Sequence, residues 1–138
     1  MRTCLYLIVF LLVLGCSKSP QEPAPNTELL EGTWLLKEVY FDPGDGSGDF
    51  TPSDAGFQVT LRPDNSFEAN YNICRVFEDG DRNSGTFARI DVSEILITCS
   101  GSVTNSIQGR LEDGLLVFYY PCIEPCIYRF EKVSDATE

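Results

Sequence analysis

The sequence predicts an all-β protein, an eight-stranded antiparallel up-and-down barrel in a single domain. Eight short runs of β-type residues are separated by turn signals, a spacing typical of a sandwich or a barrel. No window keeps the periodicity of an amphipathic helix for three turns. The connections are short, so they join antiparallel neighbours. Eight such strands in simple succession favour a meander that closes on itself and leaves no exposed edge.

The first half of the domain shows the clearest alternation of apolar and polar residues. GTWLLKEVYF, at 32–41, is followed by the acidic, glycine-rich loop 42–55. FQVTLR, at 57–62, alternates cleanly, and the turn RPDNS separates it from SFEANYNIC, at 66–74. Proline and Asp-Asn favour a turn at this point. These runs are therefore the first three predicted strands.

The second half contains five further runs of the same kind. The turn Glu112-Asp113-Gly114 separates the sixth from the seventh, and Asp-Gly is a strong hairpin signal. These five predicted strands are TFARIDV at 86–92, EILITC at 94–99, SVTNSIQGRLE at 102–112, LLVFYY at 115–120 and CIYRFEKV at 126–133.

The chain begins with the pattern of a secretory signal. Arg2 precedes an apolar run at 5–14, and Gly15 then meets Cys16. The run is shorter than the roughly 20 apolar residues that a membrane-spanning helix needs. A charged start, a short apolar stretch and a small residue indicate a signal peptide at 1–15.

The junction V-L-G-C resembles the lipobox of bacterial lipoproteins. In that family the cysteine is lipidated and becomes the first residue, which here implies lipidation of Cys16. Stable anchoring takes two acyl chains, because one chain binds a membrane only marginally. We therefore expect a lipid-anchored protein of the bacterial cell envelope, at the outer membrane or cell surface, since Ser17 is not the Asp known as a retention signal.

The remaining boundaries follow from composition. Residues 16–28 are rich in proline and polar residues, which predicts an extended tether. The barrel domain is expected at 29–134, with a short disordered tail at 135–138. The formal net charge is −11, which argues against nucleic acid and against adsorption to an anionic lipid surface.

Four cysteines remain after Cys4 leaves with the signal and Cys16 takes the lipid. An even number in an exported domain predicts two disulfides, with three possible pairings. Following the strand directions places all four at the same rim of the barrel. The pairs Cys74–Cys99 and Cys122–Cys126 are favoured by a small margin, and the other two pairings stay open.

The segment PCIEPC, at 121–126, has two alternative interpretations, a redox pair and a zinc site. A thioredoxin-type redox pair needs C-x-x-C at the start of a helix, and here the spacing is longer and β-type residues follow. A zinc site of four cysteines would usually use two close pairs, whereas Cys74 and Cys99 lie far apart in sequence. The segment is therefore interpreted as a staple at the mouth of the barrel.

Several motifs resemble those of lipocalins and lipocalin-like bacterial lipoproteins. They are the opening G-x-W of LEGTWLL, the loop PGDGSGDF, the hairpin F-x-V-T-L-x-P-D-N-S-F and the closing C-x-x-x-C-x-x-R-F-x-K-V. The resemblance covers most of the chain after the tether. It implies that Trp34 closes the base of the barrel and that Arg129 packs on the indole, a sound cation–π pairing. It supports the fold more than any activity.

The sequence predicts a binding protein and not an enzyme. It contains no histidine, so the usual general base and the commonest metal ligand are missing. No cofactor is expected. Acidic residues in the first loop are candidate calcium ligands, because carboxylates on a flexible loop can hold that ion. The candidates are Asp42, Asp45, Asp49 and Asp54.

The leading functional hypothesis is that the barrel binds a small apolar or amphipathic ligand. Inward-facing residues would line the site: Phe57, Val59, Leu61, Phe67, Tyr71, Ile95, Ile97 and Val117. An eight-stranded barrel can either be filled by its side chains or leave room for one small ligand. The alternative is therefore a packed scaffold that acts through protein contacts, as an envelope component or an inhibitor of a secreted enzyme. The protein partner is not specified by the sequence.

Overall fold

A computed structural model describes residues 30–75, 83–100 and 106–136. The predicted signal peptide, Cys16 and the tether lie outside these residues. Within them, no helix is long and apolar enough to span a bilayer.

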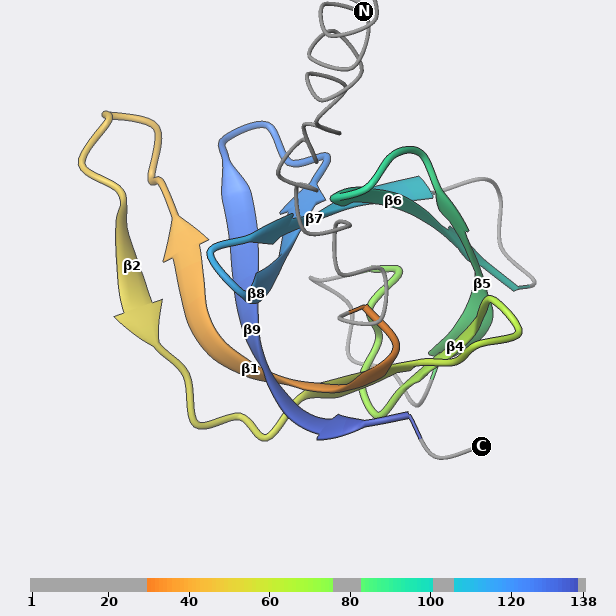
Figure 1. The fold of residues 1–138 in the computed structure, drawn as a ribbon. Helices are drawn as coiled ribbons and strands as arrows, with labels where there is room; N and C mark the ends of the chain where they lie inside the picture. The colour runs from red at the N-terminus through yellow and green to blue at the C-terminus, as the bar shows by residue number, and fades with distance from the viewer. Residues whose placement is uncertain (1–29, 76–82, 101–105, 137–138) are drawn as a thin grey trace, which may run out of the picture.

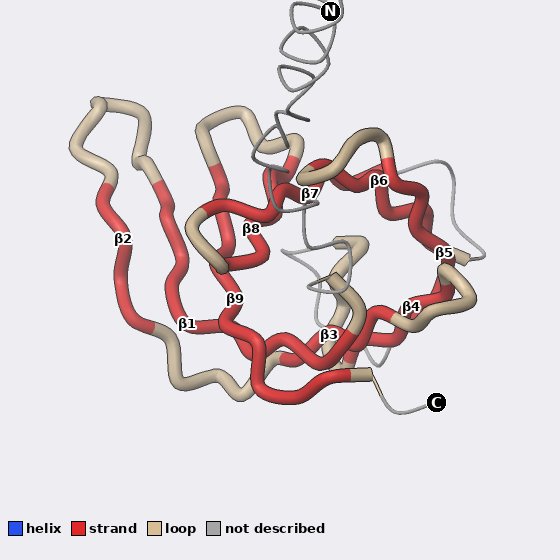
Figure 2. Tube along the Cα trace, viewed as in Figure 1, coloured by secondary structure: helices blue, strands red, loops and turns tan. Residues whose placement is uncertain are grey.

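The described chain is all β, as predicted, and forms a closed antiparallel eight-stranded barrel with one extra strand. Figures 1 and 2 show the ring of strands, with the extra strand β2 projecting from one side. The sheet order is β2-β1-β3-β4-β5-β6-β7-β8-β9, and β1 also pairs with β9. The strands are β1 Gly32–Phe41, β2 Asp49–Pro52, β3 Gln58–Leu61, β4 Ser66–Ala69, β5 Asn83–Arg89, β6 Glu94–Cys99, β7 Ser106–Glu112, β8 Leu115–Tyr120 and β9 Cys126–Asp135.

Closure of the barrel depends on the long strand β1. One edge of β1 pairs with β9 along its whole length, and the other edge is shared by β3 and β2. The register with β9 shifts between Leu36 and Glu38, which leaves Lys37 as a bulged residue. A bulge bends a strand and increases its twist, and here the upper part of β1 leaves β3 and takes β2 as its neighbour.

The strand β2 lies inside the segment 42–55 that the sequence analysis assigned to a loop. Within the described residues its outer edge pairs with no other strand. In an antiparallel ladder alternate residues point their backbone groups at the neighbouring strand. Ser53 N–H donates to the carbonyl of Lys37, so Phe50 and Pro52 face the open edge. The N–H of Phe50 is held by the side chain of Asp49, at 2.8 Å, and proline has no N–H. The edge therefore presents no free donor at these two positions.

The barrel interior is filled by one continuous cluster of buried side chains. Two glycines show how tightly it is packed. A Cβ atom on Gly85 would lie 2.7 Å from the ring of Phe67 and 2.1 Å from a backbone oxygen. One on Gly109 would lie 2.7 Å from Phe118 and 2.8 Å from Ile95. Aromatic rings therefore occupy the space that larger residues on β5 and β7 would need.

Trp34 lies at the base of the barrel, where the chain enters β1, and is almost completely buried. Its indole N–H donates to the carbonyl of Leu30 at 2.9 Å. The cation beside the ring is not Arg129, as the resemblance implied, but Lys132, whose Nζ lies 5.8 Å from the ring centroid. The register pairs Trp34 with Lys132, and the bulge brings Arg129 opposite Glu38 instead.

Arg129 packs on the outside of the barrel. Its guanidinium lies 3.5 Å from the ring centroid of Phe50 in β2, and it forms an ion pair with Glu38 at 3.2 Å. Phe50 also contacts Tyr40, with ring centroids 5.2 Å apart. Arg129 thus reaches across β1 and holds the extra strand to the barrel wall.

Candidate functional site: the disulfide-closed rim

The mouth of the barrel is closed by a segment of the chain itself, Tyr71–Cys74, which we call the plug segment. The third predicted strand was expected to continue to Cys74, but β4 ends at Ala69. The chain then turns inward, and Ile73 becomes completely buried. Tyr71 is also buried and stacks on Phe57, with ring centroids 4.6 Å apart. The plug segment therefore adds to the core of the barrel.

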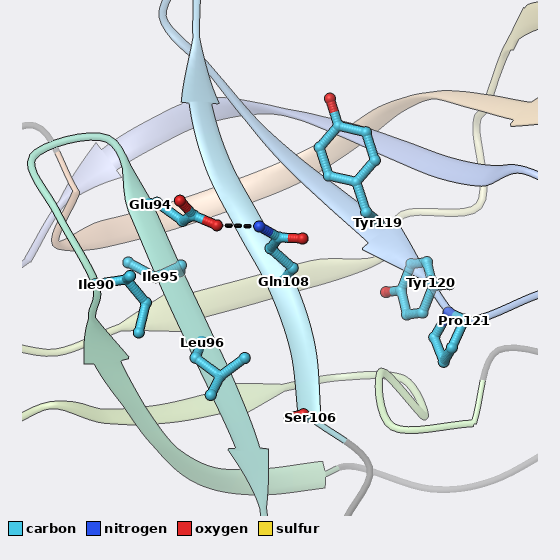
Figure 3. Close-up of a pocket in the computed structure, with 9 residues that line it drawn as sticks. All are labelled: Ile90, Glu94, Ile95, Leu96, Ser106, Gln108, Tyr119, Tyr120 and Pro121. Atoms are coloured by element: carbon cyan, nitrogen blue, oxygen red, sulfur yellow. Dashed lines mark hydrogen bonds between the residues drawn. The ribbon is translucent and has the colours of Figure 1, made fainter.

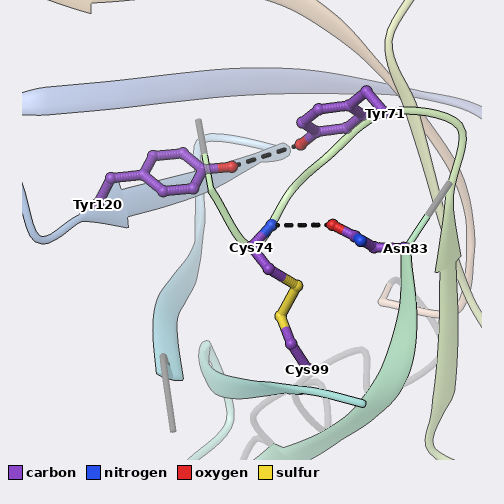
Figure 4. Close-up of a disulfide and its surroundings, with 5 residues drawn as sticks. All are labelled: Tyr71, Cys74, Asn83, Cys99 and Tyr120. Atoms are coloured by element: carbon purple, nitrogen blue, oxygen red, sulfur yellow. Dashed lines mark hydrogen bonds between the residues drawn. A yellow bond between two sulfur atoms is a disulfide. The ribbon is translucent and has the colours of Figure 1, made fainter. Parts of the chain in front are cut away.

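A disulfide fixes the end of the plug segment. Cys74 is bonded to Cys99, the last residue of β6, with their Cα atoms 6.2 Å apart. The N–H of Cys74 donates to the side-chain oxygen of Asn83 at 3.2 Å (Figure 4). The plug segment is therefore attached to β5 by a hydrogen bond and to β6 by a covalent bond.

Two tyrosine hydroxyls meet inside the rim. The hydroxyl oxygens of Tyr71 and Tyr120 point toward each other at a distance of 3.4 Å (Figure 4). Burial raises the pKa of Tyr71 well above its usual range, and the neighbouring Tyr120 adds to the shift. Burial also raises the pKa of Tyr120. Both rings therefore stay neutral at physiological pH, and the pair satisfies polar groups in an otherwise apolar interior.

The second disulfide joins Cys122 to Cys126 across the β8–β9 loop, with Cα atoms 5.9 Å apart. Both favoured pairings are thus confirmed, and segment 121–126 is a disulfide-closed loop at the rim, as predicted. Prolines at 121 and 125 further restrict this loop, because proline fixes the backbone φ angle. The side chain of Ile123, between the two cysteines, is fully exposed.

A groove of about 480 Å³ lies beside this loop. One wall is the end of β1 and the start of the β1–β2 loop, and the other is the disulfide-bonded loop. Its exposed surface is mostly apolar and includes Phe41 and Ile123. We call it the rim groove; its lining residues are Phe41, Asp42, Pro43, Pro121, Cys122, Ile123, Glu124 and Cys126.

Asp42 organises the wall of the rim groove. Among the described residues, Asp42 is the one charged residue that is buried. Its Oδ1 accepts hydrogen bonds from the N–H groups of Gly44, at 2.8 Å, and Gly46, at 3.1 Å. Both glycines have a positive φ, which most other residues avoid. Asp42 therefore holds the tight loop after β1.

The calcium hypothesis finds no support in this loop. The carboxylate of Asp45 accepts the N–H of Ser47, and that of Asp49 accepts the N–H of Phe50. Asp54 is exposed beyond β2. In residues 30–75, 83–100 and 106–136, no three acidic, histidine or cysteine side chains are grouped so that they could share a metal ion. The acidic side chains that accept these N–H groups shape the loop instead.

A second groove, of about 440 Å³, runs along the outer wall over β6, β7 and β8 (Figure 3). It is more polar: Glu94 accepts a hydrogen bond from Gln108 in its floor, and Tyr119 lies at one side. Burial and a hydrogen bond to Glu112 raise the pKa of Tyr119. Pro121 lines both grooves, so the disulfide-bonded loop separates them.

The predicted ligand-lining residues divide into three groups. Six lie in the buried core, as their inward alternation suggested: Val59, Leu61, Phe67, Tyr71, Ile95 and Ile97. Phe57 is partly buried against the core. Val117 is buried but lies outside the core cluster that contains its neighbours Leu116 and Phe118. Successive strand side chains point to opposite faces, so Val117 belongs to the outer face.

The rim groove was not among the sites predicted from the sequence. Its signal was present in PCIEPC, where an isoleucine lies between two cysteines and two prolines.

Comparison of the chain with protein-family models, with curated proteins and with solved structures gives no match.

Proposed function

We propose that this protein is a lipid-anchored component of the bacterial envelope whose packed barrel is a scaffold for protein contacts at the rim. The observation that carries the proposal is the filled interior. The residues that would line a ligand site pack against one another, and the plug segment occupies the mouth. A scaffold needs a rigid interior and an accessible surface, and the rim supplies the surface.

Binding of a small ligand inside the barrel is less well supported. Such a ligand would have to displace Tyr71 and Ile73, both buried, while Cys74 stays bonded to Cys99. Ligand sites in proteins are usually largely formed before the ligand arrives. The two grooves described above both open to solvent at the outer surface of the barrel.

The position of the rim relative to the anchor supports the same proposal. The described chain enters the barrel at Leu30, at the base, and β1 then runs ten residues to Phe41 at the rim. At about 3.3 Å per residue this strand spans roughly 30 Å. The described barrel therefore joins the predicted tether at the end opposite the rim groove.

The anchor is tested by substituting Cys16→Ser in the full chain and fractionating cells of the native host. We expect the wild-type protein in the membrane fraction, with an added mass that fits diacylglyceryl and acyl chains. The mass of the variant should lack the diacylglyceryl and acyl chains, whether or not its signal peptide has been removed. An unmodified wild-type Cys16 in the mature protein would contradict the proposal.

The scaffold function is tested by native mass spectrometry of the lipidated protein, isolated from its host under mild conditions. A complex with a second protein, released on denaturation, is the expected result. A small molecule that co-purifies at one copy per chain would instead favour ligand binding inside the barrel. In that case the amides of the plug segment should also exchange their hydrogens faster.

A further inference from the structure

We propose that the rim groove binds a protein segment that presents an apolar side chain next to a lysine or arginine. This inference rests on the proposed scaffold function and names the surface and the chemistry of the partner. The apolar side chain would lie between Phe41 and Ile123, and the cation would face Glu124.

The apolar part of the argument is the exposure of two large side chains on opposite walls of one groove. Ile123 is fully exposed and Phe41 is 56% exposed. Both line the rim groove. Single exposed apolar residues are common on protein surfaces, but an apolar groove marks an interaction site more specifically. Covering these two side chains would remove apolar surface from water.

The rigidity of the loop makes this surface suited to binding. The Cys122–Cys126 disulfide closes a short loop around Ile123, and the N–H of Cys122 donates to the carbonyl of Tyr120 at 2.8 Å. Pro121 and Pro125 add further restriction. A loop fixed in advance loses little conformational freedom when a partner binds, so more of the contact energy appears as affinity.

The charge of the groove selects the partner. Its lining contains Asp42 and Glu124 but no lysine or arginine. Exposed Asp45 follows on the same loop, and hydrogen bonds from Ser47 lower its pKa, which keeps it ionised. Walls of one sign attract segments of the opposite sign. The same charge disfavours a second copy of this acidic chain.

The two walls touch near Glu124. A Cβ atom on Gly44 would lie 3.2 Å from the carboxylate of Glu124. The carboxylate therefore lies at the junction of the two loops, beside the apolar surface. This adjacency is why we expect the basic residue of the partner to be next to its apolar side chain in sequence.

The test is photo-crosslinking of the full lipidated chain in its native host. A benzophenone side chain replaces Ile123, and in a matched control it replaces Val92, which is 57% exposed at the opposite end of the barrel. We expect a defined protein adduct only from position 123. Mass spectrometry of the adduct should place the crosslink beside an apolar residue that neighbours lysine or arginine.

Charge reversal sharpens the result. Glu124→Lys in the position-123 protein should reduce the adduct about tenfold, since a like charge facing a cation is unfavourable. Asp54→Lys, an equal reversal on an exposed residue outside the groove, should leave the yield unchanged. A lipid adduct, a dimer of this chain, a crosslink in an acidic segment, or equal yields from 92 and 123 would overturn the inference.

The proposed function and this inference can fail separately. If native mass spectrometry finds a protein complex that persists in an Ile123→Asp variant, the scaffold function stands and the rim groove is not its site. If it finds a small molecule and no protein, the scaffold function falls first.

Discussion

The two disulfides lie at the same rim but act on different parts of the molecule. Cys74–Cys99 spans 25 positions of sequence and holds the plug segment in the core. Cys122–Cys126 spans 4 positions and shapes an exposed loop. The first disulfide stabilises the packed interior, and the second restricts the conformation of an exposed loop. The difference shows that two similar covalent links at the same end of the barrel can hold a buried segment in one case and restrict an exposed loop in the other.

The number of residues that each disulfide encloses sets the stabilisation expected from it. In the chain-entropy description, a disulfide that closes a loop of 25 residues stabilises a fold by about 3.5 kcal/mol, and one that closes a loop of 4 by about 2 kcal/mol. The longer loop restricts more of the unfolded chain. The Cys74–Cys99 bond also keeps Ile73 and Tyr71 buried, which the entropy term does not count.

Removing the core disulfide should have the largest effect. We expect Cys74→Ser with Cys99→Ser to lower the free energy of unfolding by about 3–5 kcal/mol, since the loop constraint and part of the plug packing are lost together. Urea unfolding followed by tryptophan fluorescence of Trp34 measures the change. A loss under about 1 kcal/mol would mean that the plug segment is held by packing alone.

Removing the surface disulfide should cost less. Cys122→Ser with Cys126→Ser should lower the free energy of unfolding by about 2 kcal/mol or less. When the benzophenone side chain is placed at position 123 of this variant, we expect the adduct to fall several-fold, because the loop that carries position 123 is no longer fixed. Equal destabilisation by the two double variants would remove the distinction between the disulfides.

The buried tyrosine pair should make the plug sensitive to alkaline pH. The folded pKa of Tyr71 and Tyr120 lies above the unfolded value of about 10, so the unfolded chain releases these protons first. Their contribution to stability is present below pH 10 and is lost as the pH rises beyond it. Tyr71→Phe should flatten this decline and, at neutral pH, cost about 1–2 kcal/mol. Thermal melts between pH 7 and 11 compare the two proteins, and parallel curves would exclude the pair as the cause.

The exposed isoleucine should affect stability least. We expect Ile123→Asp to change the free energy of unfolding by about 0.5 kcal/mol or less, since surface substitutions rarely do more. The same variant should lose the protein partner. Chemical denaturation and the native mass spectrum, measured on one preparation, separate these effects, and a large drop in stability would show that Ile123 has a structural role.

The regular part of the fold could be predicted from the sequence because alternation and turn residues are local. All eight predicted strands correspond to barrel strands. Asp113-Gly114 forms the expected hairpin turn, with φ values of 51° and 81°. The strand β2 was missed because DFTP is short and lies among glycine, proline and aspartate, which favour loops.

The remaining differences come from tertiary packing that a local pattern does not encode. Tyr71 and Ile73 continue the alternation of Phe67 and Ala69, so nothing in the sequence distinguishes a strand that continues from a chain that turns into the barrel. The run LLVFYY has no alternation, which is why Val117 was placed on the wrong face. Arg129 was placed on Trp34 by the resemblance to lipocalins. The register instead pairs Trp34 with Lys132 and Glu38 with Arg129, and its two irregularities leave no sequence signal.

The open edge of β2 bears on how these molecules behave at high density. Growth of a β-aggregate proceeds by pairing of free backbone donors and acceptors at an exposed strand. At the two outward positions of β2 the donors are already removed, one by the side chain of Asp49 and one by Pro52. In a concentrated solution, the β2 edges of neighbouring copies therefore present carbonyl acceptors at these two positions, but no free N–H donor to match them.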